Sequence, residues 1–351
     1  MIPAYSGHGT VARGQADLKE NVEDTVSTRS PLPHTLEETA GEVPGQIRGL
    51  ADNIQQAFLG KPQVVRNALV CLFAGGHLLI EDVPGVGKTL LARALARSID
   101  CRFQRIQFTP DLLPTDVLGV SVFNMSRDEF VFKPGPIFAN VILADEINRT
   151  TPRTQSALLE AMNDFQVSID GVTHPLPEPF IVLATQNPFE FEGTYPLPES
   201  QLDRFLMRLR IGYPSLEDEK QVLETRKLSD PLDALQSVLE ARQVLQLQRR
   251  TREVAVEDSV AEYILRISDA TRGSDELVVG ASPRGSVFLY RAAQALALIQ
   301  GRDYCVPDDV KELAPLVLGH RVVPRAGFRP GSDHAGEEVV RHILEAVPVP
   351  E

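Results

Sequence analysis

The feature that most constrains the fold is a glycine-rich turn between a short apolar run and a helical segment, at residues 77–89 (HLLIEDVPGVGKT). The start of this stretch is rich enough in Leu and Ile to form a short buried strand. Pro84, Gly85 and Gly87 let the backbone turn its N–H groups inward, and the residues after the turn repeat apolar side chains as one helix face does. Because a helix N-terminus adds partial positive charge and free N–H donors, this segment predicts a binding site for phosphate groups.

The turn predicts contacts to a nucleotide such as ATP and to its Mg²⁺ ion. Lys88 would reach the β- and γ-phosphates, and the Thr89 hydroxyl would ligate Mg²⁺. The motif has its first glycine where this chain has Asp82. A tight connection that binds no ligand would also explain the glycines, so both interpretations stay open here. The expected nucleotide-binding residues of the loop are Pro84, Gly85, Val86, Gly87, Lys88, Thr89 and Leu90.

A second apolar run, Val141–Ala144, ends in two carboxylates, Asp145 and Glu146. In a site that hydrolyses a nucleotide, the first carboxylate would hold Mg²⁺ through water, and the second would polarise the water that attacks the γ-phosphate. The alternative is that both acids only cap the next helix, since carboxylates favour helix N-termini.

A third apolar run, Phe180–Thr185, leads to Asn187 in a Gln-Asn-Pro sequence. An amide at the tip of a strand can orient the same water and sense the γ-phosphate, although Asn187 could also simply start an Asn-Pro turn. Three strands that each end in polar groups favour a nucleotide-hydrolysing sheet over a chance arrangement.

Three blocks of the sequence together resemble the MoxR group of AAA+ ATPases: residues 76–89, 141–161 (VILADEINRTTPRTQSALLEA) and 182–205 (VLATQNPFEFEGTYPLPESQLDRF). The resemblance covers roughly residues 45–350, and the third block is the specific one. It implies an α/β fold, with a P-loop AAA+ core whose parallel sheet lies between helices, followed by an all-helical lid domain.

The resemblance also implies a small insertion in the second helix of the core. Residues 111–136 fit it, because Val120–Asn124 and Phe130–Lys133 alternate as a hairpin would. An ordinary surface hairpin would show the same pattern.

Arg204, in the sequence Leu-Asp-Arg-Phe, matches the family's arginine finger. Such an arginine reaches the γ-phosphate held by the neighbouring subunit and stabilises the charge of the transition state. The alternative is an ion pair within the chain, with Asp203 or Glu199, which would matter little to stability if exposed.

Arg284 matches the family's second sensor arginine, at the start of a lid helix. Ser282 and Pro283 are plausible N-cap and first-turn residues of that helix without any nucleotide. A cation in the first turn opposes the helix dipole, which favours the sensor role for Arg284. The resemblance further implies that Gly60 lies near the adenine base.

The composition opposes several other functions. A net charge of −13 disfavours general nucleic-acid binding, which needs clustered Lys and Arg, and the densest basic cluster, Arg249–Arg252, is expected at an exposed helix end. The three cysteines are widely separated, which indicates neither a disulfide framework nor a CxxC metal site. No apolar run approaches the roughly 18 residues that cross a bilayer, and no signal core is seen, so we expect a cytoplasmic protein without stable membrane insertion.

The composition also changes along the chain. Residues 1–45 are polar and lack periodicity, so we expect a disordered or flexible extension. Residues 46–213 would form the nucleotide-binding core and residues 214–351 the helical lid, with no strand after Pro214. The expected strands are 77–81, 103–108, 141–145, 180–185 and 207–211, and the expected helices are 47–59, 62–73, 89–99, 152–163, 200–205, 216–228, 233–250, 257–272, 283–300, 307–318 and 337–347.

His77, His174 and His320 lie in no ligand-spaced cluster, so we expect structural roles for them. Tyr195 and Phe189, in the loop before Arg204, could equally touch a substrate in a central pore or pack the loop.

The resemblance implies an oligomeric, Mg²⁺-dependent ATPase, a hexamer by analogy, that acts as a chaperone on a protein client. Family members assist protein maturation, cofactor insertion or complex assembly, often alongside partners with a von Willebrand factor A domain. A nucleotide-gated regulatory scaffold with slow hydrolysis is an alternative from another class. A nucleic-acid-dependent AAA+ motor is a third, which the acidic charge opposes.

Overall fold

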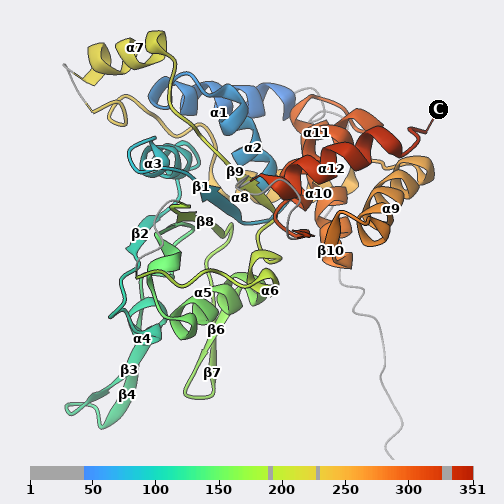
Figure 1. The fold of residues 1–351 in the computed structure, drawn as a ribbon. Coiled ribbons are helices and arrows are strands. Elements are labelled where there is room, and N and C mark those ends of the chain that lie inside the picture. The colour runs from blue at the N-terminus through green and yellow to red at the C-terminus, as the bar shows by residue number, and fades with distance from the viewer. Residues whose placement is uncertain (1–42, 189–192, 227–229, 326–333, 351) are drawn as a thin grey trace, which may run out of the picture.

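A five-stranded parallel sheet lies at the centre of the computed structural model, which describes residues 43–188, 193–226, 230–325 and 334–350 (Figure 1). Its strand order is β2-β5-β8-β1-β9, and every pairing is parallel. The strands are β1 (Leu78–Glu81), β2 (Phe103–Gln107), β5 (Val141–Asp145), β8 (Ile181–Gln186) and β9 (Met207–Leu209). All five expected strands are therefore present, and β1, β5 and β8 are adjacent.

Successive residues of the central strands point to opposite faces of the sheet and into two separate cores. Leu143 and Leu183 belong to the larger core, with side chains from α1 (Val43–Ala57), α2 (Pro62–Phe73) and α3 (Lys88–Ser98). Ile142 and Val182 belong to the smaller core, with side chains from α4 (Pro114–Leu118) and α5 (Pro152–Asp164). The sheet is thus covered on both faces, which confirms the expected α/β architecture.

Two hairpins project from the same end of the molecule (Figure 1). The hairpin expected within residues 111–136 is present as β3 (Gly119–Asn124) paired with β4 (Glu129–Pro134), and its identity as the family's insertion stays a prediction. A second hairpin, β6 (Gln166–Ile169) with β7 (Val172–Pro175), was not expected. The rings of Phe132 and His174 stack with centroids 4.0 Å apart, so the two hairpins are joined.

The region after the sheet is mainly helical, as expected: α7 (Leu216–Arg226), α8 (Ala241–Glu253), α9 (Asp258–Gly273), α10 (Pro283–Ile299), α11 (Pro307–Leu318) and α12 (Ala335–Ala346). Side chains of α10, α11 and α12 enter the larger core, so the lid and the nucleotide-binding core share buried apolar surface. The expectation of no strand after Pro214 is wrong, because β10 (Leu277–Val279) pairs antiparallel with β11 (Val323–Pro324).

Three expected boundaries also differ from the structure. Helix α1 begins at Val43, inside the segment 1–45 expected as an extension, and Pro44 suits a first helical turn. Residues 1–42 lie outside the described residues. Helix α6 (Glu199–Leu202) ends before Arg204, where we expected helix through 205.

The helix expected at 233–250 instead begins after Glu240. The Glu240 backbone N–H donates to Gln243 Oε1 at 2.8 Å, which is one half of a capping box. Leu232, Leu235 and Leu239 are buried at a spacing that imitates a helix, although they precede it. In the residues that the structure describes, no helix is both long and apolar enough to cross a membrane.

Candidate nucleotide-hydrolysing site

The phosphate-binding loop lies between β1 and α3, as the sequence predicts. Gly85 and Gly87 have φ angles of 88° and 99°, in the region that favours glycine, and α3 begins at the next residue, Lys88. A Cβ at Gly87 would also lie only 3.1 Å from the Phe58 ring. The loop residues Pro84, Gly85, Val86, Gly87, Thr89 and Leu90 are exposed or half-buried. Its backbone N–H groups are therefore placed where an anion could approach the start of the helix.

Asp82, which replaces the first glycine of the motif, uses its carboxylate on backbone N–H groups. Its Oδ2 accepts from Ile211 and Gly212, each at 2.7 Å, and its Oδ1 accepts from Val83 at 2.8 Å. The Asp82 carbonyl oxygen accepts from the Lys88 ammonium group. The residue thus fastens the phosphate-binding loop to the segment after β9.

Asp145 and Glu146 lie at the carboxyl end of β5, next to the end of β8. Thr185 of β8 joins them, because its hydroxyl donates to Asp145 Oδ1 at 2.6 Å and accepts from the Glu146 N–H at 2.9 Å. Glu146 has a φ of 57°, which is uncommon for a residue other than glycine. Backbone conformations of this kind are concentrated at functional sites.

Two side chains of β2 bind these carboxylates, and our sequence analysis missed both. Arg105 donates to Asp145 Oδ2 through Nε at 3.0 Å and through Nη2 at 2.6 Å, and to Gln107 Oε1 at 2.7 Å. The Gln107 amide donates in turn to Glu146 Oε2 at 2.8 Å. Arg149 Nε lies 3.0 Å from the same oxygen. We call Arg105 and Gln107 the β2 pair; they connect the expected metal ligand to the expected base.

Asn187 follows β8 directly, which places it at the same edge of the sheet as the phosphate-binding loop and Asp145. The preceding residue, Gln186, donates to Glu81 of β1. Arg208 binds the other oxygen of Glu81 at 3.0 Å and Glu337 of α12 at 3.1 Å. This edge of the sheet is therefore tied to the lid.

Arg204 lies in the turn after α6, and its guanidinium makes no ion pair within the described residues. The alternative of an intrachain pair with Asp203 or Glu199 is therefore not seen there. Asp203 is bound instead by Arg321, whose Nε lies 2.9 Å from Oδ1, and by the Ser282 hydroxyl at 2.9 Å.

Arg284 is the second residue of α10, as expected for the start of a lid helix. Ser282 is the N-cap, with its hydroxyl accepting from the Gly285 N–H at 3.2 Å, and Pro283 is the first helical residue. In the described part of the chain Arg284 also makes no ion pair. Helix-start chemistry accounts for Ser282 and Pro283 but not for the positive charge of Arg284.

Gly60, expected near the adenine, lies between α1 and α2 with a φ of 75°. A Cβ there would come within 2.3 Å of the Asp218 carboxyl group of α7, so only glycine fits this approach. Its role toward a nucleotide stays a prediction.

The histidines have structural surroundings. His77 is buried, accepts from the Val182 N–H at Nδ1 (3.1 Å) and therefore donates from Nε2 to the Met162 carbonyl (2.9 Å). Burial lowers the pKa of His77 to about 4, so the ring is neutral. Burial and the adjacent Arg321 lower the pKa of His320 well below its usual value. No cluster of three or more His, Cys, Asp or Glu side chains that could hold a metal occurs in the described residues.

Tyr195, which precedes Arg204 in the sequence, is held by hydrogen bonds of its backbone. The Tyr195 N–H donates to the Asn148 carbonyl at 2.6 Å, and the Gln155 amide donates to the Tyr195 carbonyl at 3.0 Å. Tyr195 as a whole residue is nevertheless 44 % exposed. Phe189 lies outside the described residues.

The chemistry of the donor atoms fits Mg²⁺. Thr89 offers a hydroxyl and Asp145 a carboxylate, and Mg²⁺ prefers oxygen ligands of which protein supplies only one or two beside phosphates and water. For Asp145 Oδ2 to face a metal ion or its bound water, the hydrogen bond from Arg105 to this oxygen would have to break.

Comparisons with known proteins show what the whole chain is similar to. Residues 77–207 match the model of the ATPase family associated with various cellular activities (AAA), and residues 269–343 match the AAA lid domain. The uncharacterized protein YeaC of Bacillus subtilis is 52 % identical, over 85 % of this chain and 93 % of the relative. Chaperone MoxR1 of Mycobacterium tuberculosis is 40 % identical, over 92 % of this chain and 90 % of the relative. A crystal structure of a Cytophaga hutchinsonii protein assigned as an ATPase has a TM-score of 0.83 and 37 % identity, and the match covers 90 % of this chain and 98 % of the other.

Proposed function

The chain belongs to the MoxR family of AAA+ ATPases, and we propose that it hydrolyses Mg²⁺-bound ATP in a ring of identical subunits and directs the work to a protein client. The observation that carries this proposal is the adjacency of β1, β5 and β8 in one parallel sheet. Their carboxyl ends bring the phosphate-binding loop, the two carboxylates and Asn187 to a single edge, where a nucleoside triphosphate would be bound and cleaved.

The residues would divide the chemistry as follows. The backbone of the loop and Lys88 bind the phosphates, and Thr89 and Asp145 hold Mg²⁺, which neutralises phosphate charge when bound. Glu146 takes the proton from the attacking water, and Asn187 orients that water. These roles follow from the positions of the side chains at one edge and from the family resemblance.

Two arginines would complete the site. We propose that Arg204 reaches the nucleotide of the neighbouring subunit, which is supported by its lack of an ion pair in the described residues. Arg284 would bind the nucleotide of its own subunit from the start of α10 and couple nucleotide state to the lid. A ring, with six subunits by family analogy, supplies the geometry that both roles require.

The joined hairpins support a protein client. Met125 and Phe130 are 90 % and 73 % exposed, and Val120 and Phe123 are also exposed on the same hairpin. Exposed apolar side chains gathered on a projecting element are typical of protein contact surfaces. We propose that the client, or a partner with a von Willebrand factor A domain, binds there, in protein maturation, cofactor insertion or complex assembly. The three free cysteines support placement in a reducing cytoplasm.

One observation also favours the regulatory scaffold. The β2 pair and Arg149 engage both catalytic carboxylates, and such engagement favours slow basal hydrolysis. If the protein is a scaffold, a variant that binds but does not hydrolyse ATP should still release its partner according to how much ATP is bound. Work that requires continuous turnover would instead support the chaperone.

The ATPase mechanism can be tested with two inactive variants. Glu146→Gln should bind ATP and assemble but not turn over, and Arg204→Ala should keep its own carboxylates but lack the finger. We expect a mixture of the two to regain ATPase activity, because an Arg204→Ala site can receive a finger from a Glu146→Gln neighbour. Normal hydrolysis by Glu146→Gln alone would remove Glu146 from the role of base. Absence of recovery in a verified mixed oligomer would rule out a site shared between subunits.

The nucleic-acid motor has its own test. Stimulation of the ATPase rate by single- or double-stranded DNA, assayed in parallel, would support it.

A further inference from the structure

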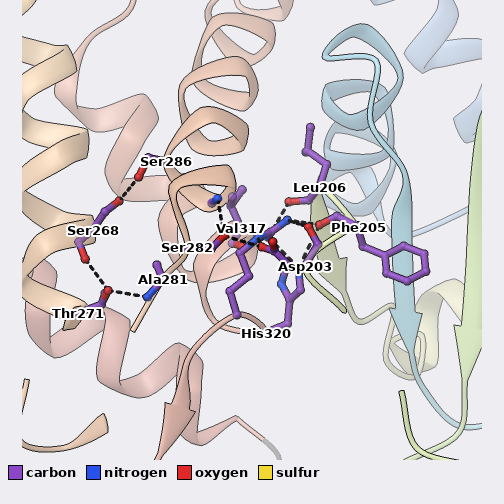
Figure 2. Close-up of polar contacts among 12 residues, drawn as sticks. Asp203, Phe205, Leu206, Ser268, Thr271, Ala281, Ser282, Ser286, Val317 and His320 are labelled. Atoms are coloured by element: carbon purple, nitrogen blue, oxygen red, sulfur yellow. Dashed lines mark hydrogen bonds and ion pairs between the residues drawn. The ribbon is translucent and has the colours of Figure 1, made fainter. Parts of the chain in front are cut away.

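The carboxylate of Asp203 joins the loop that carries Arg204 to two separate parts of the lid (Figure 2). Ser282 Oγ donates to Asp203 Oδ1 at 2.9 Å, and Arg321 Nε donates to the same oxygen at 2.9 Å. Ser282 is the N-cap of α10, and Arg321 follows α11. One oxygen in the nucleotide-binding core thus receives both lid groups.

Arg321 also holds the backbone of the Arg204 loop. Its guanidinium donates to the carbonyl oxygens of Asp203 (3.2 Å), Leu206 (3.3 Å) and Phe205, and to that of Val317 near the end of α11. The side chain is 1 % exposed, and burial lowers its pKa to about 10 although Asp203 opposes the shift. Arg321 therefore stays charged at neutral pH, and its position fixes the carbonyls on both sides of Arg204.

The start of α10 is tied to α9 as well. The Ala281 N–H donates to the Thr271 hydroxyl at 2.9 Å, which donates to the Ser268 carbonyl at 2.6 Å, and the Ser286 hydroxyl donates to that of Ser268 at 2.9 Å (Figure 2). These bonds make the beginning of α10 one unit with α9. A displacement of this unit would carry the Ser282 hydroxyl with it.

Two cations lie close along the chain to this junction. Arg204 directly follows Asp203, and Arg284 is two residues after Ser282. Asp203 neutralises neither, because within the described residues its carboxylate is bound by Ser282 and Arg321. Both guanidinium groups are left for anions, and under the proposed function these anions are the phosphates of two different nucleotides.

We infer that Asp203 is a positioning residue, which sets the Arg204 finger from the lid of its own subunit through Ser282 and Arg321. The inference rests on the proposed function, since it requires Arg204 to act on the neighbouring site. It adds a direction of control: a lid that shifts at α10 moves the finger offered to the next subunit. Each subunit thus reports the state of its own lid to its neighbour.

The test uses full-length chains in the mixture described above, with Glu146→Gln as finger donor and Arg204→Ala as recipient. Ser282→Gly removes the hydroxyl bond to Asp203, while glycine remains acceptable as an N-cap. When Ser282→Gly is placed in the donor chain, we expect the ATPase rate of the recipient sites to fall about tenfold, because a small misplacement of a catalytic group lowers the rate strongly. Placed in the recipient chain, it should have a clearly smaller effect. Ser282→Thr in the donor keeps a hydroxyl and should restore the rate.

The outcomes separate the inference from the proposed function. An equal loss in both placements, or a loss only in the recipient, would overturn the role of Asp203 while leaving the shared site intact. Absence of recovery in the parent mixture would instead overturn the shared site itself and the inference with it. Asp203→Asn in the donor is the second variant, because it keeps the side-chain shape and removes the charge. Oligomer mass and melting temperature of each chain confirm that the compared mixtures contain folded, assembled protein.

Discussion

The carboxylate of Asp82 accepts a hydrogen bond from the backbone N–H of Gly212 at 2.7 Å, which joins the phosphate-binding loop to the segment that follows β9. The Ile211 N–H binds the same oxygen at the same distance. The aspartate that replaces the first glycine of the motif therefore holds the loop in place. Its carboxylate accepts hydrogen bonds from backbone N–H groups, and these bonds balance its negative charge.

Asp82→Gly should consequently weaken the fold more than it weakens nucleotide binding. We expect a loss of about 2 kcal/mol in the free energy of unfolding, because buried N–H groups lose their acceptor. ATP affinity should change little. Denaturant unfolding without nucleotide and equilibrium binding of ATP measure the two effects separately. Lys88→Ala is the matched comparison, with ATP binding lost and stability nearly kept; a large gain in ATP affinity for Asp82→Gly would show that the carboxylate repels phosphate after all.

Gln107→Leu should raise the basal ATPase rate. The amide restrains Glu146 through a 2.8 Å hydrogen bond, and its removal frees the carboxylate to meet water. We expect kcat to rise about fivefold, equivalent to about 1 kcal/mol for one net hydrogen bond, with KM for ATP unchanged. Gln104→Leu on the same strand is the control, since residues three apart on a strand point to opposite faces of the sheet. A fall in kcat would mean that Gln107 assists the reaction rather than restraining the base.

Arg105→Met should tighten metal binding. Arg105 occupies Asp145 Oδ2, the oxygen that a metal ion would approach, and its side chain is 49 % exposed. A half-exposed ion pair contributes little, so we expect the affinity for Mn²⁺ with a non-hydrolysable ATP analogue to rise only about two- to fivefold. Electron paramagnetic resonance titration of free Mn²⁺ measures it. Arg102→Met removes an exposed cation from the residue just before the same strand and should leave the affinity unchanged. Weaker Mn²⁺ binding by the Arg105 variant would show that the arginine supports the metal site.

Acidification should destabilise the protein partly through His77. Its pKa is lowered to about 4 in the folded chain, against 6.5 for an ordinary histidine, so between these values the unfolded chain binds the extra proton. Stability from this residue is complete above pH 6.5 and is lost as the pH falls toward 4, by about 3 kcal/mol at most. His77→Gln should reduce the difference in unfolding free energy between pH 7.5 and pH 4.5 by about 2 kcal/mol. An unchanged difference would assign the pH dependence to other groups, with His320 the first to examine.

The phosphate-binding loop and the polar strand ends could be predicted from the sequence because their signals are local. A glycine turn before a helix, or two acids after an apolar run, occupies a few consecutive residues, and the parallel sheet brings the strand ends together without further information. Gly87 and Asp145 therefore lie where the sequence placed them.

The missed features depend on contacts between distant parts of the chain. Arg321 and Asp203 are 118 residues apart in the sequence, and no local pattern near either residue predicts their contact. The two residues of the β2 pair are two positions apart on a strand, from which the sequence predicts only that both side chains lie on the same face. The hairpin β6–β7 did have a local signal, the Asp170-Gly171 turn between alternating residues, and its positive φ values of 52° and 80° fit a two-residue hairpin turn.

The stacking of Phe132 on His174 has a mechanical consequence. The hairpin β3–β4 leads into the amino end of β5, and the hairpin β6–β7 leads into the amino end of β8. A load applied at the joined hairpins would reach both strands at once, from the ends opposite to Asp145 and Asn187. The two strands would then transmit a force between the joined hairpins at one end and the nucleotide-hydrolysing edge of the sheet at the other.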